Sequence, residues 1–597
     1  MKKLSIITVV VLLAIFNSCS DKFLDETPQG STPENNLYNE QGIDALLTGT
    51  YAMVRGSSLW EVSWGASIQN WTYGSVASDD AYKGSEITDQ KPVNEIERWE
   101  VTTTNNYPAE KWRLNIGMGV NRANNVLILI PKIPGLSQEK ATQIKAQARF
   151  LRGLFYFESW LVFGDKIPLI TEDKIATAKE IKNVNAPGAV LNFIIDDLKF
   201  AWENLPEKRE SGEIGRPTKY AAMALAARAY LQELKYAEAK PLLDNIINSG
   251  KYSLMPNFFD NYRITQENNK ESIFEIQANV NDINESLNAE MGIGLNWPHG
   301  SDIGMCCGFH QPSQNLANAF RVDANGLPRF DDLYTSDLKN DQGIASKDEF
   351  IPSTEPLDPR IDWTMGRRGI PYLDWGIMRG ADWIRKQSEG GPYMPALKPF
   401  FYKSQRYSLS TTTGWQTGIN ANNYRYLRYG HILLWRAEVA AFEGDYANVL
   451  KYINMIRDRA DNELVMGKVN IYKLPGSVYP FGAAGDVDFT QPAANYKIGQ
   501  YASFASKKEA MRAVQWELRL EFATEGMRFF DLRRWDKLPA DVKVANMADV
   551  LNNFARADER IREFMKGATF EEKDKYQPVP QGQIDIQPGV LEQNTGY

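Results

Sequence analysis

The chain has 597 residues, of which 43% are hydrophobic and 24% are charged, and its formal net charge at neutral pH is −8. This composition is ordinary for a globular protein, and the length suffices for a large core, in one or two lobes. The acidic balance argues against a nucleic-acid partner, because phosphate binding requires a basic surface.

The first residues have the layout of a secretory signal of the lipoprotein type. Lys2 and Lys3 precede an apolar run, residues 4–16, which is shorter than the roughly 20 residues that a transmembrane helix needs. Ser18 then precedes Cys19, so we expect residues 1–18 to be cleaved and Cys19 to be lipidated. Several acyl chains on one residue would anchor the protein stably. The alternative is an ordinary secretory signal with an incidental cysteine.

A polar stretch follows the expected lipidation position. Residues 19–38 carry acidic side chains, and Pro28, Gly30 and Pro33 oppose helix formation. We expect this stretch to be a flexible tether and residues 39–597 to form a single body.

Several segments of the body predict helices by their apolar period. Residues 141–163 carry apolar side chains every three or four positions, and Gly164 and Pro168 then end the pattern. The same reasoning predicts helical structure in the ranges 191–205, 218–249, 431–460 and 507–525.

Two of these ranges repeat one pattern. Leu-x-Ala at 225–227 is followed by Tyr236, and Trp-x-Ala at 435–437 is followed by Tyr446. Small residues in a first helix let a second helix approach, and we expect the tyrosine at the turn to pack back over the pair. This is the logic of a tetratricopeptide-like hairpin.

The helical period is lost between about residues 250 and 430, where glycine, proline and aromatic residues are frequent. Residues 272–278 alternate like a short strand. We expect long ordered loops at 292–312 and 366–391, and loops of that length in a compact body are usually functional.

The sequence contains only three cysteines, two of which are adjacent. Cys306 and Cys307 have Cα atoms about 3.8 Å apart, closer than the roughly 4.4–6.8 Å of most disulfides. We therefore expect the core, and no disulfide framework, to hold the fold.

Short segments along the whole chain carry a family pattern. They include Val-Ala-Ser-Asp-Asp-Ala-Tyr at 76–82, Gly-Arg-Pro-Thr at 215–218 and Arg-Phe-Phe-Asp-Leu-Arg-Arg-Trp at 528–535. The others lie at 19–25, 148–157, 163–170, 308–314, 357–363, 517–523, 576–581 and 591–597. In their shared order these segments resemble the SusD/RagB family of outer-membrane nutrient-binding lipoproteins, over essentially the whole chain.

The resemblance implies a mostly α-helical, SusD-like fold with four tetratricopeptide-like helix pairs and long ordered loops. We expect an N-terminal helical half (39–270), a loop-rich, ligand-facing region (271–430) and a C-terminal helical half (431–597). The resemblance also implies a position on the outer face of the outer membrane, held there by the lipid anchor. In the family, the lipoprotein delivers captured oligosaccharide to a SusC-like TonB-dependent β-barrel transporter.

Candidate ligand-binding residues follow from the chemistry of a neutral glycan. Its hydroxyl rim and C–H faces require aromatic platforms and a few directional polar groups. The family's site is built from loops of two regions that are rich in such residues here. The candidates are Trp64, Trp71, Tyr73, Asp79, Asp80, Trp99, Trp297, Trp375 and Trp415. The alternative for each tryptophan is burial in the core, and for the aspartates a turn or helix cap.

No catalytic residue, metal site or cofactor is predicted. His299, His310 and His431 lack the close spacing of metal ligands. A charged cluster near the C-terminus could form an anion site, but we interpret it as a salt-bridge network, since charges of mixed sign neutralise each other. Its members are Glu517, Glu521, Glu525, Arg528, Arg533 and Arg534.

The leading hypothesis is therefore a non-catalytic surface protein that binds oligosaccharide. A peptide- or glycopeptide-capturing lipoprotein of the RagB type is the alternative binding function. A surface glycoside hydrolase would need two carboxylates about 5–9.5 Å apart, and no known hydrolase motif is present. A helical-repeat adaptor would leave the aromatic loops unexplained.

Overall fold

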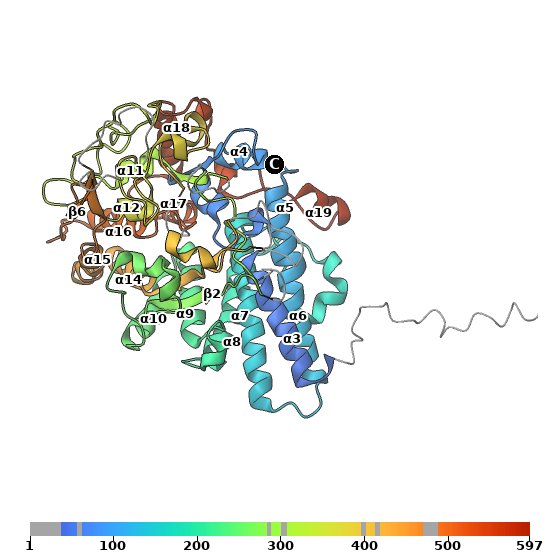
Figure 1. Ribbon diagram of the computed structural model, residues 1–597. Coiled ribbons are helices and arrows are strands. Elements are labelled where there is room, and N and C mark those ends of the chain that lie inside the picture. Colours follow the sequence, from blue (N-terminus) through green and yellow to red (C-terminus); the bar gives the residue numbers. More distant parts are fainter. Residues whose placement is uncertain are drawn as a thin grey trace, which may run out of the picture.

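The structure, a computed structural model, describes residues 37–56, 63–282, 288–299, 307–395, 402–411, 418–469 and 487–597. The expected leader (1–18), Cys19, most of the expected tether and Trp415 lie outside these residues. The fold is mostly α-helical, as the resemblance implies (Figure 1).

The N-terminal half contains α3 (Glu40–Tyr51), α4 (Lys91–Glu97), α5 (Asn106–Trp112), α6 (Asn121–Leu129), α7 (Gln138–Phe163), α8 (Ala189–Asn204), α9 (Lys219–Gln232) and α10 (Tyr236–Asn248). Two π-helical segments, η4 (Trp71–Val76) and η5 (Arg113–Val120), join them. The predicted helix at 141–163 is part of α7. Its N-cap Ser137 accepts a hydrogen bond from the Lys140 amide, and Gly164 ends it with φ +62°.

The C-terminal half contains α14 (Tyr429–Glu443), α15 (Tyr446–Ala460), α16 (Lys507–Glu521), α17 (Arg528–Trp535), α18 (Met547–Asp558) and α19 (Gln581–Ile586). Short helices interrupt the middle loops: α11 (Gln314–Ala319), α12 (Ile361–Thr364) and α13 (Gln387–Gly390). The predicted helical ranges are therefore confirmed. Two of them, 218–249 and 431–460, each hold two helices.

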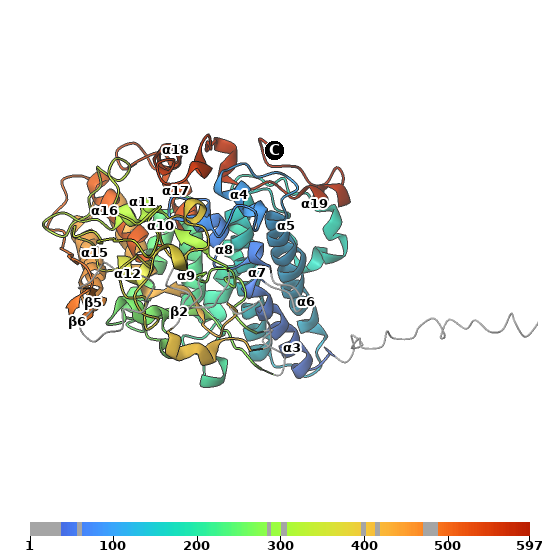
Figure 2. The ribbon, with the colours of Figure 1, turned by 45° about the horizontal axis from the view of Figure 1, so that its top comes forward.

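Consecutive helices pack side by side in a row that crosses the molecule (Figures 1 and 2). Along this row α7 contacts α8, α8 contacts α9, α9 contacts α10, and α10 contacts α14, which packs against α15 and α16. The hairpins α9–α10 and α14–α15 confirm the repeated pattern of the sequence. Tyr236 differs from the expectation: its hydroxyl donates to Glu438 of α14 at 2.8 Å, and its ring lies against Phe442. The tyrosine therefore joins one hairpin to the next.

Three antiparallel ribbons of two strands each lie among the described loops. β1 (Ala81–Gly84) pairs with β3 (Phe309–Pro312), and β5 (Met466–Val469) pairs with β6 (Val487–Pro492). β2 (Ser272–Ile276), the strand expected from alternation, pairs with β4 (Tyr424–Arg428), with Glu275 opposite Arg425. We call this pair the β2–β4 ribbon.

A buried ionic network confirms part of the charged cluster as structural. Glu521 of α16 lies beside Arg360, Arg428 and Arg459, and the four side chains are at most 3% exposed. Glu517, also fully buried, pairs with Arg360 and with Arg457 of α15. The network therefore ties α16 to α15, β4 and the start of α12.

The other members of the cluster have separate partners. Arg528 pairs with Asp79 at 2.8 Å, and Arg534 pairs with Glu438. Arg533 instead donates to the backbone carbonyls of Leu161 (2.7 Å) and Lys575 (2.9 Å).

The last residues return to the N-terminal half. The Gln577 amide donates to the Val162 carbonyl, and the Asn594 side chain donates to the Phe163 carbonyl. Asn183 donates to the Glu592 carbonyl at 2.8 Å. The C-terminal segment therefore lies against the end of α7, and in Figure 1 the C-terminus lies near α4 and α5.

Two further observations concern the cysteines and the membrane. Cys307 is disulfide-bonded, to a partner outside the described residues, which the spacing argument did not predict. Within the described ranges, none of the helices combines the length and the apolar character needed to cross a bilayer.

Candidate functional site

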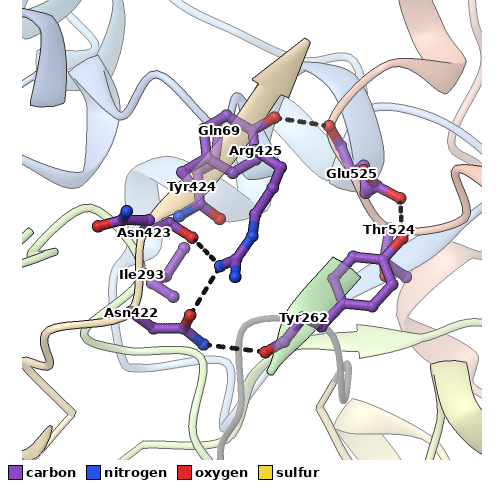
Figure 3. A pocket seen from close by; sticks show the side chains of 9 residues that line it. All are labelled: Gln69, Tyr262, Ile293, Asn422, Asn423, Tyr424, Arg425, Thr524 and Glu525. Carbon is purple, nitrogen blue, oxygen red and sulfur yellow. Dashed lines mark hydrogen bonds between the residues drawn. The ribbon is translucent and has the colours of Figure 1, made fainter. Parts of the chain in front are cut away.

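A pocket along β4 is the candidate site (Figure 3). The cavity itself measures about 40 Å³, within an empty space of about 450 Å³ that includes its solvent-open part. It is lined by Gln69, Tyr262, Ile293, Asn422, Asn423, Tyr424, Arg425, Thr524 and Glu525. We call it the β4 pocket. Its walls come from five separate parts of the chain, so tertiary packing alone creates it.

Two glycines allow the walls to meet. A Cβ on Gly74, in η4, would lie 1.8 Å from the carbonyl oxygen of Gly526. Gly526 itself has φ +74°, and a Cβ there would lie 1.8 Å from the Gln69 carbonyl oxygen. No side chain fits at such distances, so both positions require glycine. This contact places Thr524 and Glu525 beside Gln69.

The polar groups of the β4 pocket are held by one another. Arg425 donates from Nη1 to Asn422 Oδ1 (2.9 Å) and to the Asn423 carbonyl (2.6 Å). Asn422 Nδ2 donates to the Tyr262 carbonyl at 3.3 Å, and the Tyr262 hydroxyl donates to Glu525 Oε1 at 2.7 Å. Figure 3 shows these bonds around the pocket. The site is therefore pre-formed, as small-molecule sites usually are.

The charges of the β4 pocket are largely compensated. Arg425 Nε lies 3.4 Å from Glu275 Oε1, and Glu525 lies 3.3 Å from Arg428. Such a site offers carboxamide and hydroxyl groups to an uncharged ligand, without a net charge that would select an ion. Among the described residues, no group of three or more His, Cys, Asp or Glu side chains is placed to hold a metal ion.

A half-buried carboxylate, that of Glu267, contacts Asn423 of the β4 pocket. Burial raises the pKa of Glu267 to about 7, although the Asn423 amide donates to it at 2.7 Å and Arg425 lies nearby. Glu290, whose neighbours include Gly292 and Arg55, is fully buried, and burial raises its pKa to about 7 as well. Both carboxyls therefore take up protons on folding in mildly acidic solution.

Glu267→Gln is expected to flatten the pH dependence of stability. The folded pKa is raised from 4.5, so the native state binds more protons than the unfolded state between about pH 4.5 and 7. Stability therefore falls as pH rises through that window and is level above it. Glutamine removes this loss and should raise the free energy of unfolding at pH 8 by about 1–2 kcal/mol. Urea denaturation at several pH values measures the free energy of unfolding. If this free energy changed with pH in the same way in both proteins, the raised pKa of Glu267 would be contradicted.

Trp71 and Trp297 belong to two different apolar clusters of the core. Trp71 Nε1 donates to the Gly292 carbonyl at 2.9 Å, next to Ile293 of the pocket wall. Trp297 Nε1 donates to the Gly418 carbonyl at 2.8 Å. The two regions expected to build the site do meet where Trp71 bonds to Gly292, but both rings are buried in the core.

Asp79 and Asp80 form buried ion pairs. Arg519 contacts both aspartates, at 3.1 Å and 2.8 Å, and Arg528 contacts Asp79. These contacts are ion pairs within the protein, whereas the roles expected from the sequence were ligand contact or a turn or helix cap. Tyr73 is buried in the same part of the core.

The remaining candidates are dispersed. Trp99 packs edge-on against Phe570, with its Nε1 bonded to the Ala77 carbonyl. Trp375 lies in a second apolar cluster with Trp297. Among the candidates that the structure describes, Trp64 is partly exposed, whereas the others are buried. Ligand contact by the candidate set stays a prediction, and the contacts seen for its buried members are those of core residues.

Sequence reasoning missed the carboxamides of the β4 pocket. Asn420, Asn422 and Asn423 form an asparagine-rich run immediately before β4, and this run was the available signal. Gln69 and Glu525 stand in segments that show no such bias.

Sequence comparison finds two family matches. A model described as "SusD family" matches residues 270–597, and one described as "Starch-binding associating with outer membrane" matches residues 22–231. A SusD-like protein P25 from Formosa agariphila is 23% identical over 46% of this chain and 52% of its own length. A SusD-like protein from Bacteroides ovatus is 25% identical over 46% and 49%. The chain thus spans about half the length of the curated relatives it matches.

Solved structures share the fold over nearly the whole chain. The surface glycan-binding protein A from Bacteroides fluxus has a TM-score of 0.64 and 22% identity, covering 94% of this chain and 100% of its own. The Bacteroides thetaiotaomicron protein of the same name, in complex with laminarihexaose, has a TM-score of 0.61 and 18% identity, covering 93% and 99%.

Proposed function

Because this chain belongs to the SusD family, we propose that it is a non-catalytic, cell-surface lipoprotein that captures oligosaccharide. The β4 pocket is the proposed binding site. The observation that carries this proposal is its pre-formed set of carboxamide, hydroxyl and charge-compensated groups. Directional, uncharged hydrogen bonding suits the hydroxyls of a neutral sugar.

The fold likeness supports the ligand class. Solved proteins with this fold include a glycan-binding protein in complex with laminarihexaose and a laminarin-binding SusD-like protein. Trp64, partly exposed and close to Gly294, the chain neighbour of the pocket residue Ile293, is the proposed aromatic contact.

We also propose a lipid anchor at Cys19 and delivery of the ligand to a SusC-like TonB-dependent β-barrel in the outer membrane. The leader-like residues 1–18 and the "associating with outer membrane" match support the anchor. The proposal for the transporter rests on family membership.

Asn422→Ala is expected to weaken oligosaccharide binding about tenfold or more. The wild-type protein should bind with a Kd in the micromolar to millimolar range, about −4 to −8 kcal/mol. Loss of Asn422 removes one carboxamide of the pocket lining and frees Arg425 from one of its restraints. A tenfold change in affinity corresponds to about 1.4 kcal/mol. Isothermal titration calorimetry against a panel of oligosaccharides measures the loss.

Asn279→Ala is the matched control, because Asn279 lies outside the β4 pocket. Its affinity should equal that of the wild type. No heat with any glycan would overturn the proposed function, and release of reducing sugar from a bound polysaccharide would revive the hydrolase alternative.

A further inference from the structure

A groove lies between the π-helical segment η5 and the helix α19, on the side of the molecule that carries α5 and α6 (Figure 1). Its walls come from residues 112–121, from residues 168–179, which cover most of the 3₁₀ segment η7 (Glu172–Glu180), and from Gln583 and Gln587. The cavity measures about 310 Å³, within an empty space of about 820 Å³ that includes its solvent-open part. We call it the α19 groove. None of its lining residues belongs to the β4 pocket.

The lining of the α19 groove is mainly apolar. Its large apolar side chains are those of Trp112, Ile116, Val120, Ile170 and Ile175. An apolar cavity of about 150 Å³ accommodates a benzene ring. A cavity of about twice that volume therefore has room for an aromatic ring together with an aliphatic side chain.

The lining carries one charged side chain, which is positive. Lys179 is exposed at the rim and has no ion-pair partner among the residues that the structure describes. The Gln587 side chain donates to the Lys179 carbonyl at 3.0 Å, so η7 and α19 are joined beside this cation. An apolar groove with a cation at its rim is complementary to an apolar segment that carries acidic side chains.

The chain contains such a segment outside the described residues. Phe23 and Leu24 are the only large apolar residues in the stretch 20–36, and Asp25 and Glu26 follow them directly. A solvated tether has no use for two adjacent apolar side chains, because exposed apolar surface is unfavourable in water. The pair is therefore better explained by a binding partner on the protein.

The stretch is long enough to reach the α19 groove. Its end is fixed beside α6, since the Lys132 ammonium lies 5.6 Å from the centre of the Tyr38 ring. From Lys132 back along α6 to the lining residue Asn121 is about 17 Å, at 1.5 Å per residue. Leu24 precedes Leu37 by 13 positions, which span up to about 43 Å when extended.

We propose that residues 23–26 of the same chain dock in the α19 groove, with the two apolar side chains against its wall and the carboxylates beside Lys179. The consequence of docking rests on the proposed lipid anchor at Cys19. Cys19 precedes Phe23 by four positions, which span at most about 14 Å, whereas the undocked stretch from Cys19 to Leu37 spans up to about 60 Å. Docking would therefore hold the surface around the α19 groove close to the membrane and fix the orientation of the body.

The test is disulfide crosslinking in intact cells that express the full-length chain. Thr27→Cys is paired with Ala178→Cys, a half-buried position of the lining, and crosslinks within one chain are quantified by mass spectrometry of the unreduced digest. Thr27→Cys with Glu139→Cys is the matched control, because Glu139 is exposed beside Lys140, which pairs with Glu40 at the start of α3. An undocked stretch reaches this position as easily as the groove, so docking should make the groove pair crosslink about fivefold faster or more.

Two further substitutions in the groove pair separate docking from mere proximity. Phe23→Ser should lower the crosslinking rate to that of the control pair, whereas Thr32→Ala, in the polar part of the same stretch, should leave the rate unchanged. The proposal is overturned if the groove pair is no faster than the control pair, if Phe23→Ser has no effect, or if the crosslinks join two copies of the chain. The N-terminal peptide of the same digest shows whether Cys19 is acylated, so loss of the proposed anchor and failure of docking are measured separately.

Discussion

Glu521→Gln is expected to lower the free energy of unfolding at pH 7 by about 3 kcal/mol. Burial alone would raise the pKa of Glu521, but Arg459, Arg428 and Arg360 outweigh it and hold the pKa at about 2, against an ordinary value of 4.5. The difference, about 2.5 pH units, is the favourable interaction of the charged carboxylate with these guanidinium groups. Neutral glutamine loses this interaction and leaves the three cations under-compensated in the core.

The pH profile provides an independent check of Glu521. A depressed folded pKa gives stability that is present above about pH 4.5 and is lost as pH falls toward 2. The variant should therefore show a shallower loss in that acidic window, measured by urea denaturation. Glu572→Gln is the control, because Glu572 pairs with Lys575 at the surface and its side chain is 83% exposed. The urea midpoint of this variant should equal that of the wild type. Equal urea midpoints for Glu521→Gln and Glu572→Gln would contradict the claim that the buried ionic network stabilises the fold.

Gly74→Ala is expected to destabilise the protein by about 3 kcal/mol and to weaken ligand binding at the same time. The added methyl would meet the Gly526 backbone at 1.8 Å, and backbone cannot rotate away as a side chain can. The turn that carries Thr524 and Glu525 must therefore shift, which opens one wall of the β4 pocket. Thermal unfolding and calorimetry with the same oligosaccharide measure the two effects.

Gly117→Ala is the matched control for this substitution. Gly117 also lies in a π-helical segment, but a Cβ there meets nothing within 4 Å. This variant should keep both stability and affinity. A Gly74→Ala protein that binds ligand as well as the Gly117→Ala protein would show that the glycine contact does not shape the pocket.

The helices could be predicted because their signals are local. The apolar period of α7 and the stop at Gly164 are properties of neighbouring residues, and the structure places the helix end at that glycine. The turn tyrosine of the first hairpin was harder to place. Tyr236 bonds to Glu438, more than 200 residues away, and sequence alone does not reveal which hairpin is the neighbour.

The site could be predicted only as a region. Trp71 does bond to Gly292, the neighbour of the pocket residue Ile293, but aromatic residues serve the core as readily as a ligand, and the sequence does not distinguish the two. Asp79 shows the same limit, because its partner Arg528 is 449 residues away. The placement of the carboxamides in the β4 pocket depends on where the β2–β4 ribbon packs, and no local pattern encodes that position.

The ion pair between Asp79 and Arg528 has a consequence for how the polypeptide matures. While the first few hundred residues emerge during synthesis or secretion, both guanidinium partners of Asp79, Arg519 and Arg528, are still missing. Burial of the Asp79 carboxylate without these counter-ions is costly, so we expect the early part of the chain to close stably only after the last hundred residues are available. Chains truncated before Arg519 should therefore be more sensitive to proteases than the complete protein.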